Sequence, residues 1–216
     1  GLDIEEQRRL ARHDDFSAFE LPQASLSANL DVAFEKIESQ NVLARLPGST
    51  RADETLMVSS HWDAYGHGVS DLQGRTVRPS ANDDALDTAG VIELTRVLKS
   101  GTPMARSVVF AVWTAEESGL LGSAAYAMEP IYPLHSTVAN FTLDILQTAG
   151  LARDVILVDE GQSDLEDDLT RAAALQSRVV TPENFPENGL FFRADHFALA
   201  RQAVPVLLIM GIAGGA

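Results

Sequence analysis

The sequence predicts an α/β fold in which helices cover both faces of a central, mostly parallel but mixed sheet, a three-layer αβα sandwich. Short apolar runs alternate along the chain with stretches of helical periodicity, which is the element order of such folds. Several runs are almost uninterrupted by polar residues, as expected for strands buried on both faces. The 216 residues are enough to build a core of this kind.

The strands of the sheet are expected where the apolar runs lie. These runs are residues 55–60, 107–114, 138–146, 155–158 and 204–210. Residues 26–34 and 41–46 also have an extended pattern, and the second segment ends at the turn signal Pro47-Gly48. Most of the sheet is therefore expected to come after residue 50.

Helices are expected between these strands. The best-marked helix covers residues 88–99, in which apolar residues recur at helical spacing from Val91 to Leu98. Asp87-Thr88 precedes this apolar stripe as a capping pair. The other predicted helices are residues 118–128 and 164–175, the latter with acidic residues in its first turn, where the helix dipole favours them.

The composition excludes several classes of function. With 31 Asp and Glu against 16 Lys and Arg, the net charge of -15 repels a phosphate backbone, so nucleic acid is excluded as a partner. No apolar run approaches the roughly 20 residues of a membrane span. The absence of cysteine excludes disulfides, thiolate zinc sites and a cysteine nucleophile. A bound metal would therefore need His, Asp and Glu ligands.

The first candidate metal ligand is His61, directly after the predicted strand at residues 55–60. Residues two apart in an extended segment point to the same side, so Asp63 is placed to orient the His61 ring from behind. Taken alone, the pair fits an ordinary strand end with a solvated carboxylate better. The same holds for Asp83 and Asp84, which alone are explained as helix-capping acids.

Further acidic residues lie at the ends of other predicted strands. They are the pair Glu116-Glu117 after residues 107–114, Asp144 within residues 138–146, and Asp195-His196 before residues 204–210. Adjacent like charges at the carboxyl end of a buried strand are costly without a cation. Two histidines and several carboxylates suit a hard or borderline divalent ion, zinc above all.

The order of these motifs resembles zinc peptidase family M28, the co-catalytic di-zinc aminopeptidases. The resemblance covers residues 40–212. It rests on His61-Trp62-Asp63, Asn82-Asp83-Asp84-Ala85, Glu116-Glu117-Ser118-Gly119-Leu120-Leu121-Gly122-Ser123, Asp144 and Arg193-Ala194-Asp195-His196-Phe197. The segment that begins at Glu116 is the most specific of these motifs.

The resemblance implies a zinc-dependent aminopeptidase with a zinc-exopeptidase-like fold, two zinc cofactors and a peptide substrate. Glu116 would be the general base and Asp63 would support His61. The implied zinc ligands are His61 and Asp144 for one ion, Glu117 and His196 for the other, and Asp83 as the bridge. The acidic composition suits a substrate ammonium group. Relatives of this kind are secreted or periplasmic, and we expect the same location here, although the chain shows no signal peptide.

Two alternatives to an aminopeptidase remain open. Arg193, close to the last motif, keeps a carboxypeptidase of the same family open, because Arg suits a substrate carboxylate. A non-catalytic binding module with the same fold is the other. A single-zinc glutaminyl cyclase is less favoured, because all five implied ligand positions are filled.

The chain departs from the family pattern in places. Relatives usually have Ser-Gly-Thr where this chain has Leu86-Asp87-Thr88, and the sequence around Asp144 matches only loosely. The final helix and the upstream protease-associated domain of many relatives have no counterpart. We therefore expect residues 1–216 to form a single catalytic domain, truncated at its C-terminus.

Overall fold

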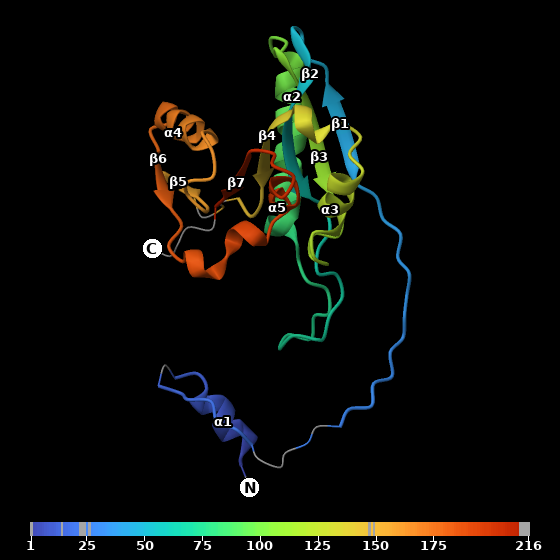
Figure 1. Cartoon of the computed structure of the whole chain (residues 1–216), viewed down its shortest axis with the longest axis vertical. Coiled ribbons are helices and arrows are strands. Elements are labelled where there is room, and N and C mark those ends of the chain that lie inside the picture. Colours follow the sequence, from blue (N-terminus) through green and yellow to red (C-terminus); the bar gives the residue numbers. More distant parts are fainter. Residues whose placement is uncertain are drawn as a thin grey trace. The chain divides into compact units, whose positions relative to one another are not determined.

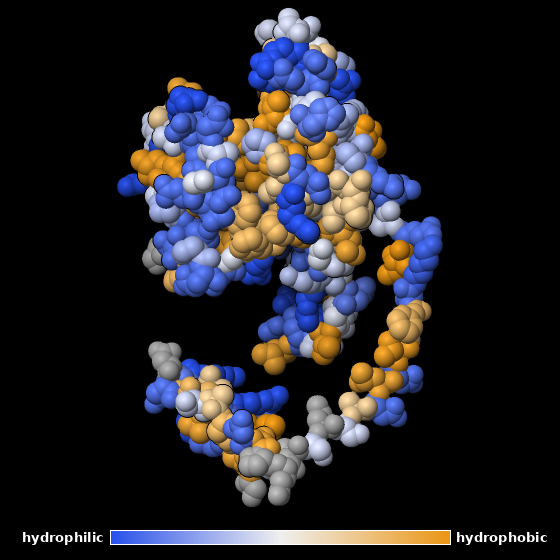
Figure 2. Space-filling view, viewed as in Figure 1, coloured by the Kyte–Doolittle hydropathy of each residue, from blue (hydrophilic) through white to orange (hydrophobic). Residues whose placement is uncertain are grey.

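The computed structural model describes residues 2–13, 15–21, 25, 27–146, 148 and 150–211. The chain divides into two compact units, Gly1–Ile37 and Glu38–Ala216. The smaller unit contains helix α1 (Ile4–Leu10), which begins where the Asp3 carboxylate accepts the backbone N–H groups of Glu5 and Glu6. Leu26, the start of the predicted extended segment, lies outside the described residues. Residues 27–34 pair with no strand that the structure describes, and their apolar side chains are exposed (Figure 2).

The larger unit is built on a seven-stranded mixed sheet with the strand order β1-β3-β2-β4-β7-β5-β6. Strands β3, β2, β4 and β7 run parallel to one another, and β5 and β6 form a parallel pair, whereas β1 joins β3, and β5 joins β7, in antiparallel pairs. The strands are β1 (Val42–Leu46), β2 (Arg51–His61), β3 (Arg106–Trp113), β4 (Thr137–Leu143), β5 (Asp154–Leu157), β6 (Val179–Pro182) and β7 (Val206–Met210).

Helices cover both faces of this sheet, which confirms the predicted three-layer fold (Figure 1). Alternate residues of β3 point to opposite faces of the sheet. Val109, Ala111 and Trp113 pack in one apolar cluster, and Val108 and Phe110 pack in another. The first cluster includes residues of α3 (Leu121–Met128) and α5 (His196–Ala200). The second includes residues of α2 (Leu86–Ser100), and a further cluster joins α4 (Leu165–Leu175) to β5 and β7.

Most predicted elements are present, with shifted ends. The helix predicted to start at residue 118 begins at Leu121, because Gly119 and Leu120 have positive φ angles of 104° and 60°. The strand predicted to reach residue 146 ends at Leu143, since the chain turns at Ile145, where φ is 52°. Strand β6 and helices α1 and α5 were not predicted. No described helix is long and apolar enough to cross a bilayer.

The capping role predicted for Asp87-Thr88 is wrong. Helix α2 starts at Leu86 after a distorted turn, Ala81–Ala85, and its start has no side-chain cap in the described chain. Asp87 is buried inside this first turn, and the Thr88 hydroxyl donates to the carbonyl oxygen of His61 at 2.8 Å. These polar groups therefore face the sheet rather than solvent.

Candidate metal centre

The candidate metal centre lies at the carboxyl ends of the central strands. The chain leaves β2 for β3 on one side and then returns to β4 on the other side of β2, so the strand order reverses there. Open α/β sheets bind ligands at such a point. His61 is the last residue of β2, and Asp144 follows the last residue of β4. The strand-end placement predicted for both is therefore confirmed.

Three predicted ligands converge on one point. Single ligand atoms of His61, Asp83 and Asp144 all lie within 4.8 Å of one another. The closest pair, Nε2 of His61 and Oδ1 of Asp83, is 3.0 Å apart. Two atoms bound to one tetrahedral zinc at about 2.0 Å would be about 3.3 Å apart, so this spacing suits ligands of a common ion.

The hydrogen bonding of His61 also fits a metal ligand. The side chain is buried, yet neither ring nitrogen makes a hydrogen bond of ordinary geometry with any described residue. Buried polar atoms are normally satisfied, so ring nitrogens of this kind facing carboxylates are typical of a site that binds a cation. The residues present therefore fit a divalent metal ion at this position.

Asp63 connects two of the motifs. Its Oδ1 lies 3.5 Å from Nδ1 of His61, on the side of the ring away from Asp83. The same carboxylate accepts the backbone N–H of Glu116 at 2.9 Å and that of Glu117 at 3.1 Å. Asp63 thus lies behind the His61 ring, as predicted, and also holds the turn that carries both glutamates.

The local fold around the glutamates depends on close backbone packing. Gly122, at the start of α3, approaches the end of β3 so closely that a Cβ atom would lie 2.3 Å from the carbonyl oxygen of Thr114. Asn41 bridges the two segments, because its amide donates to the Gly122 carbonyl and its oxygen accepts the Thr114 N–H. The glycine therefore brings the turn with Glu116 against the sheet.

Glu116 is buried and its Oε2 lies 4.0 Å from Nε2 of His61. Burial, together with the negative charges of nearby acids, raises the pKa of Glu116 to about 9. Burial also raises the pKa of Asp144 to about 6. Glu117 is less buried, and the hydroxyl of Tyr65 partly offsets the rise in its pKa. These raised pKa values are typical of a site built to hold positive charge.

His196 is fully buried at the start of α5, against the ring of Phe191 at a centroid distance of 4.9 Å. Burial lowers its pKa to about 4, so the imidazole is neutral, the form that binds metals. Its ring nitrogens make no hydrogen bond of ordinary geometry within the described ranges. However, neither His196 nor Glu117 belongs to the 4.8 Å group of His61, Asp83 and Asp144.

Two buried acids near the centre were not predicted as site residues. Asp84 accepts the backbone N–H of His61 at 2.9 Å, and Asp87 accepts that of Leu146 at 3.2 Å. Burial, with the neighbouring Asp87 carboxyl, raises the pKa of Asp84 to about 11. The helical spacing of Asp87 and the buried Val91 is the signal that Asp87 faces inward, whereas Asp84 lies in the distorted turn before α2 and has no such signal.

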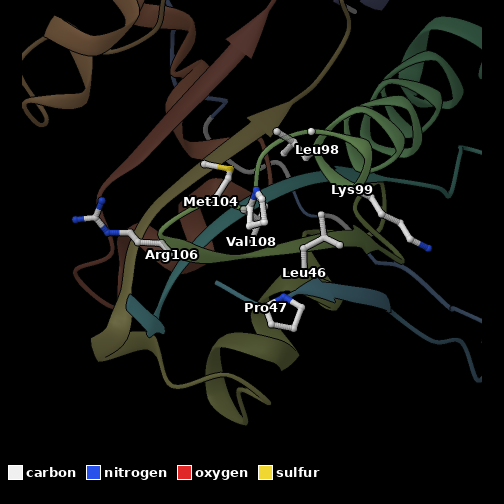
Figure 3. Close-up of a pocket in the computed structure, with 9 residues that line it drawn as sticks. Leu46, Pro47, Leu98, Lys99, Met104, Arg106 and Val108 are labelled. Atoms are coloured by element: carbon white, nitrogen blue, oxygen red, sulfur yellow. The ribbon is translucent and has the colours of Figure 1, made fainter. Parts of the chain in front are cut away.

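A cavity of about 190 Å³ opens beside these groups. Its lining includes Tyr65, which the sequence did not indicate as a site residue, and the predicted Arg193. The acids that line it are Asp83, Glu116, Glu117 and Asp144. Another cavity, of about 180 Å³, lies between α2 and the opposite end of the strands, near Val108 and Met104 (Figure 3). The acidic residues thus mark the first cavity as the candidate site.

The family of the chain follows from comparison with known proteins. The sequence profile of Peptidase family M28 matches residues 41–215, which include every motif described above. The chain belongs to this family. The predicted resemblance is therefore confirmed.

Relatives in the family carry aminopeptidase names. Aminopeptidase NAALADL1 of Mus musculus is 36% identical over 113 residues, which are 50% of this chain and 14% of that protein. Aminopeptidase YwaD of Bacillus subtilis (strain 168) is 30% identical over 146 residues, which are 66% of this chain and 30% of that protein. The M28 chain thus spans less than a third of either relative.

Solved structures share the fold of this M28 chain. The zinc aminopeptidase BSAP from Bacillus subtilis has a TM-score of 0.60 at 24% identity, over 79% of this chain and 39% of that one. Glutaminyl cyclase from Porphyromonas gingivalis has a TM-score of 0.64 at 15% identity, over 82% of this chain and 64% of that one. Because the fold hosts both activities, function has to be argued from the site.

Proposed function

We propose that this chain carries the catalytic site of a zinc-dependent aminopeptidase that hydrolyses the first peptide bond of a peptide. The observation that carries the proposal is the convergence of His61, Asp83 and Asp144 within 4.8 Å, next to the buried Glu116. The family and the aminopeptidase names of the relatives support the same conclusion.

We propose zinc as the metal and two ions as its number. A set of imidazole and carboxylate ligands suits zinc, and matched relatives include proteins named as probable zinc metalloproteases. When bound, zinc would polarise the substrate carbonyl and lower the pKa of water, so that the attacking water gives up its proton more easily. His61 and Asp144 would hold one ion, Glu117 and His196 the other, and Asp83 both.

Glu116 has the position of a general base. It is buried at the edge of the ligand group, and its carboxyl points toward His61 without an ion pair to Lys or Arg in the described chain. Its raised pKa falls once positive charge enters the site, which makes the carboxylate available. Glu116 would then take a proton from the attacking water and deliver it to the leaving amine.

The surroundings of the site favour a peptide with a free amino terminus. The net charge of -15 attracts an ammonium group to the chain, while Asp83 and Glu117 in the cavity wall are assigned to the metal ions. A further cavity, of about 250 Å³ and mostly apolar, shares the wall residues Leu190 and Met210 with the acidic cavity at the candidate metal centre. This recess offers space for an apolar side chain of the terminal residue.

The test combines metal content with activity. We expect elemental analysis to find about two zinc ions per chain, and we expect release of the chromophore from leucyl-4-nitroanilide. Glu116→Gln should abolish release while zinc content stays unchanged. Glu129→Gln, at an exposed acid that ends α3, is the matched control and should retain full activity. A folded protein without zinc would instead support a non-catalytic binding module.

A carboxypeptidase is the second candidate, favoured by Arg193 in the cavity wall. A peptide that is blocked at one end distinguishes aminopeptidase activity from carboxypeptidase activity. Hydrolysis of an N-acetylated peptide with a free carboxyl terminus, and none of the aminoacyl anilide, would assign carboxypeptidase activity.

A further inference from the structure

The acidic cavity at the candidate metal centre contains an unexpected cation. Four acidic residues line this cavity. Of its described lining residues, Arg193 is the one with a positively charged side chain. A lone cation in such surroundings normally pairs with a carboxylate, because the pairing offsets charge on both sides. Whether the Arg193 guanidinium has such a partner therefore shows whether it is available to a ligand.

The Arg193 side chain has no partner in the part of the chain that the structure describes. Among the residues that the structure describes, no carboxylate lies within 4.0 Å of its guanidinium and no hydrogen bond to it is formed. Some arginines elsewhere are paired, because Arg51 and Arg106 both contact Glu54 and Arg96 contacts Glu93, whereas Arg193 lines the acidic cavity and is unpaired within the described ranges. Arg193 is exposed and free to bind a ligand at the cavity.

The backbone around Arg193 is well anchored. Its N–H donates to the carbonyl of Leu190, and the next residue, Ala194, is buried. The rings of Phe191 and Phe192 pack edge to face at 5.5 Å, which fixes the preceding turn. One short segment thus carries the apolar wall residue Leu190, the guanidinium and, three residues on, His196.

We propose that Arg193 binds a carboxylate of the substrate, so that short peptides with a carboxylate next to the scissile bond, dipeptides foremost, are the preferred substrates. The planar guanidinium fork matches a carboxylate with two parallel hydrogen bonds. Arg193 lines the same cavity of about 190 Å³ as the candidate ligands Asp83 and Asp144, so a carboxylate bound by Arg193 would lie close to the bond that is cleaved at the metal centre. This inference rests on the peptidase function proposed above and names its substrate class.

The test compares matched substrates on the zinc-loaded chain. Leucyl-leucine should have a kcat/KM about 10- to 100-fold above that of leucyl-leucine amide, because a bond to a charged group is lost in the amide. Arg193→Gln should remove this preference by raising KM for the free acid, with less than a twofold change for the amide. Arg193→Lys, which keeps the charge but loses the fork, should fall between the two.

A second substrate pair identifies the source of the carboxylate. A preference for leucyl-aspartic acid amide over leucyl-asparagine amide that Arg193→Gln removes would assign the contact to an acidic side chain instead of the terminal carboxylate. Arg171→Gln removes the same charge from the exposed face of α4 and should change none of these ratios.

Two results would overturn the inference. One is a wild-type chain that hydrolyses free acids and amides equally well in both pairs, a result that requires no variant to fold. The other is an equal loss on all substrates in Arg193→Gln. A chain that hydrolyses none of the peptides refutes the peptidase function itself, which distinguishes that failure from a failure of the Arg193 assignment.

Discussion

The Asp84 carboxylate accepts the backbone N–H of His61 at 2.9 Å, so the residue next to one candidate ligand fixes the backbone of another. Asp87, in the first turn of α2, accepts the N–H of Leu146, two residues after the candidate ligand Asp144. The two buried acids therefore connect the ends of β2 and β4 to the start of α2.

We predict that Asp84→Ala destabilises the metal-free protein, whereas Asp84→Asn does not. Alanine leaves the buried N–H of His61 without an acceptor, which costs about 1–3 kcal/mol. Because the pKa of Asp84 is raised to about 11, the carboxyl is neutral at pH 7, and an amide of the same shape replaces it with its acceptor oxygen retained. Urea unfolding of both variants with a chelator present measures the difference. Equal losses in the two variants would contradict this role.

Asp63→Asn should reduce kcat without unfolding the protein. The amide keeps one acceptor oxygen, so one of the two hydrogen bonds to the N–H groups of Glu116 and Glu117 is lost, and the support of His61 weakens. Loss of such a supporting carboxylate reduces activity or metal affinity about 10- to 100-fold. Steady-state kinetics at saturating zinc and zinc titration separate the two effects. The exposed Asp53→Asn is the control and should behave as wild type.

The metal-free protein should lose stability as the pH rises from 7 to 9. Burial raises the pKa of Asp84 to about 11, that of Glu116 to about 9 and that of Asp195 to about 7. The folded state therefore keeps protons that the unfolded chain releases near pH 4, and this stabilisation disappears as the pH passes the folded pKa values. The His196 pKa is lowered to about 4, so its contribution is complete above about 6.5 and constant over this range.

Differential scanning fluorimetry measures this pH effect. With a chelator present, we expect the Tm to fall by about 2–4 °C per pH unit between pH 7 and 9. With zinc bound, the carboxylates are ionised and the decrease should become smaller. Glu116→Gln removes one of the groups whose raised pKa causes this fall and should make the metal-free curve less steep, while Asp84 keeps the remaining slope. A metal-free Tm that rises with pH would show that these acids are not buried as described.

The central part of the fold could be predicted because its strands coincide with runs of apolar residues in the sequence. Residues 107–114 form an apolar run buried on both faces, and β3 covers Arg106–Trp113. Strand β6 has four residues with half-exposed side chains, and α5 has five residues, so neither carries a periodic signal of its own. Both exist because neighbouring elements pair with them or pack on them, which local sequence does not encode.

The candidate ligands could be predicted for a related reason. Each lies in or beside a loop at the end of a recognisable strand, and parallel strands present those ends at one edge. The inward side chain of Asp84 could not be predicted the same way, because its partner is the backbone of His61, 23 residues earlier. Tyr65 lies in a loop, and only the folded chain brings it beside Glu117. Long-range contacts thus account for the residues that were missed.

The recess beside the metal centre predicts a preference for apolar terminal residues. It is lined by Ile156, Val158, Phe185, Leu190 and Met210, with polar Glu183, Asn184 and Asn188 at the same wall. Each methylene group buried there contributes about 0.8 kcal/mol. The kcat/KM for leucyl-4-nitroanilide should therefore exceed that for alanyl-4-nitroanilide by at least tenfold.

Leu190→Lys tests whether this recess is responsible, because Leu190 lines both cavities. The charged side chain should abolish the preference for leucine while alanyl-4-nitroanilide, whose methyl group does not need the recess, is hydrolysed at nearly the wild-type rate. Leu151→Lys, at a fully exposed leucine outside both linings, is the matched control and should preserve the ratio. If Leu190→Lys slows both substrates equally, Leu190 supports the segment that carries His196 instead of contacting the substrate.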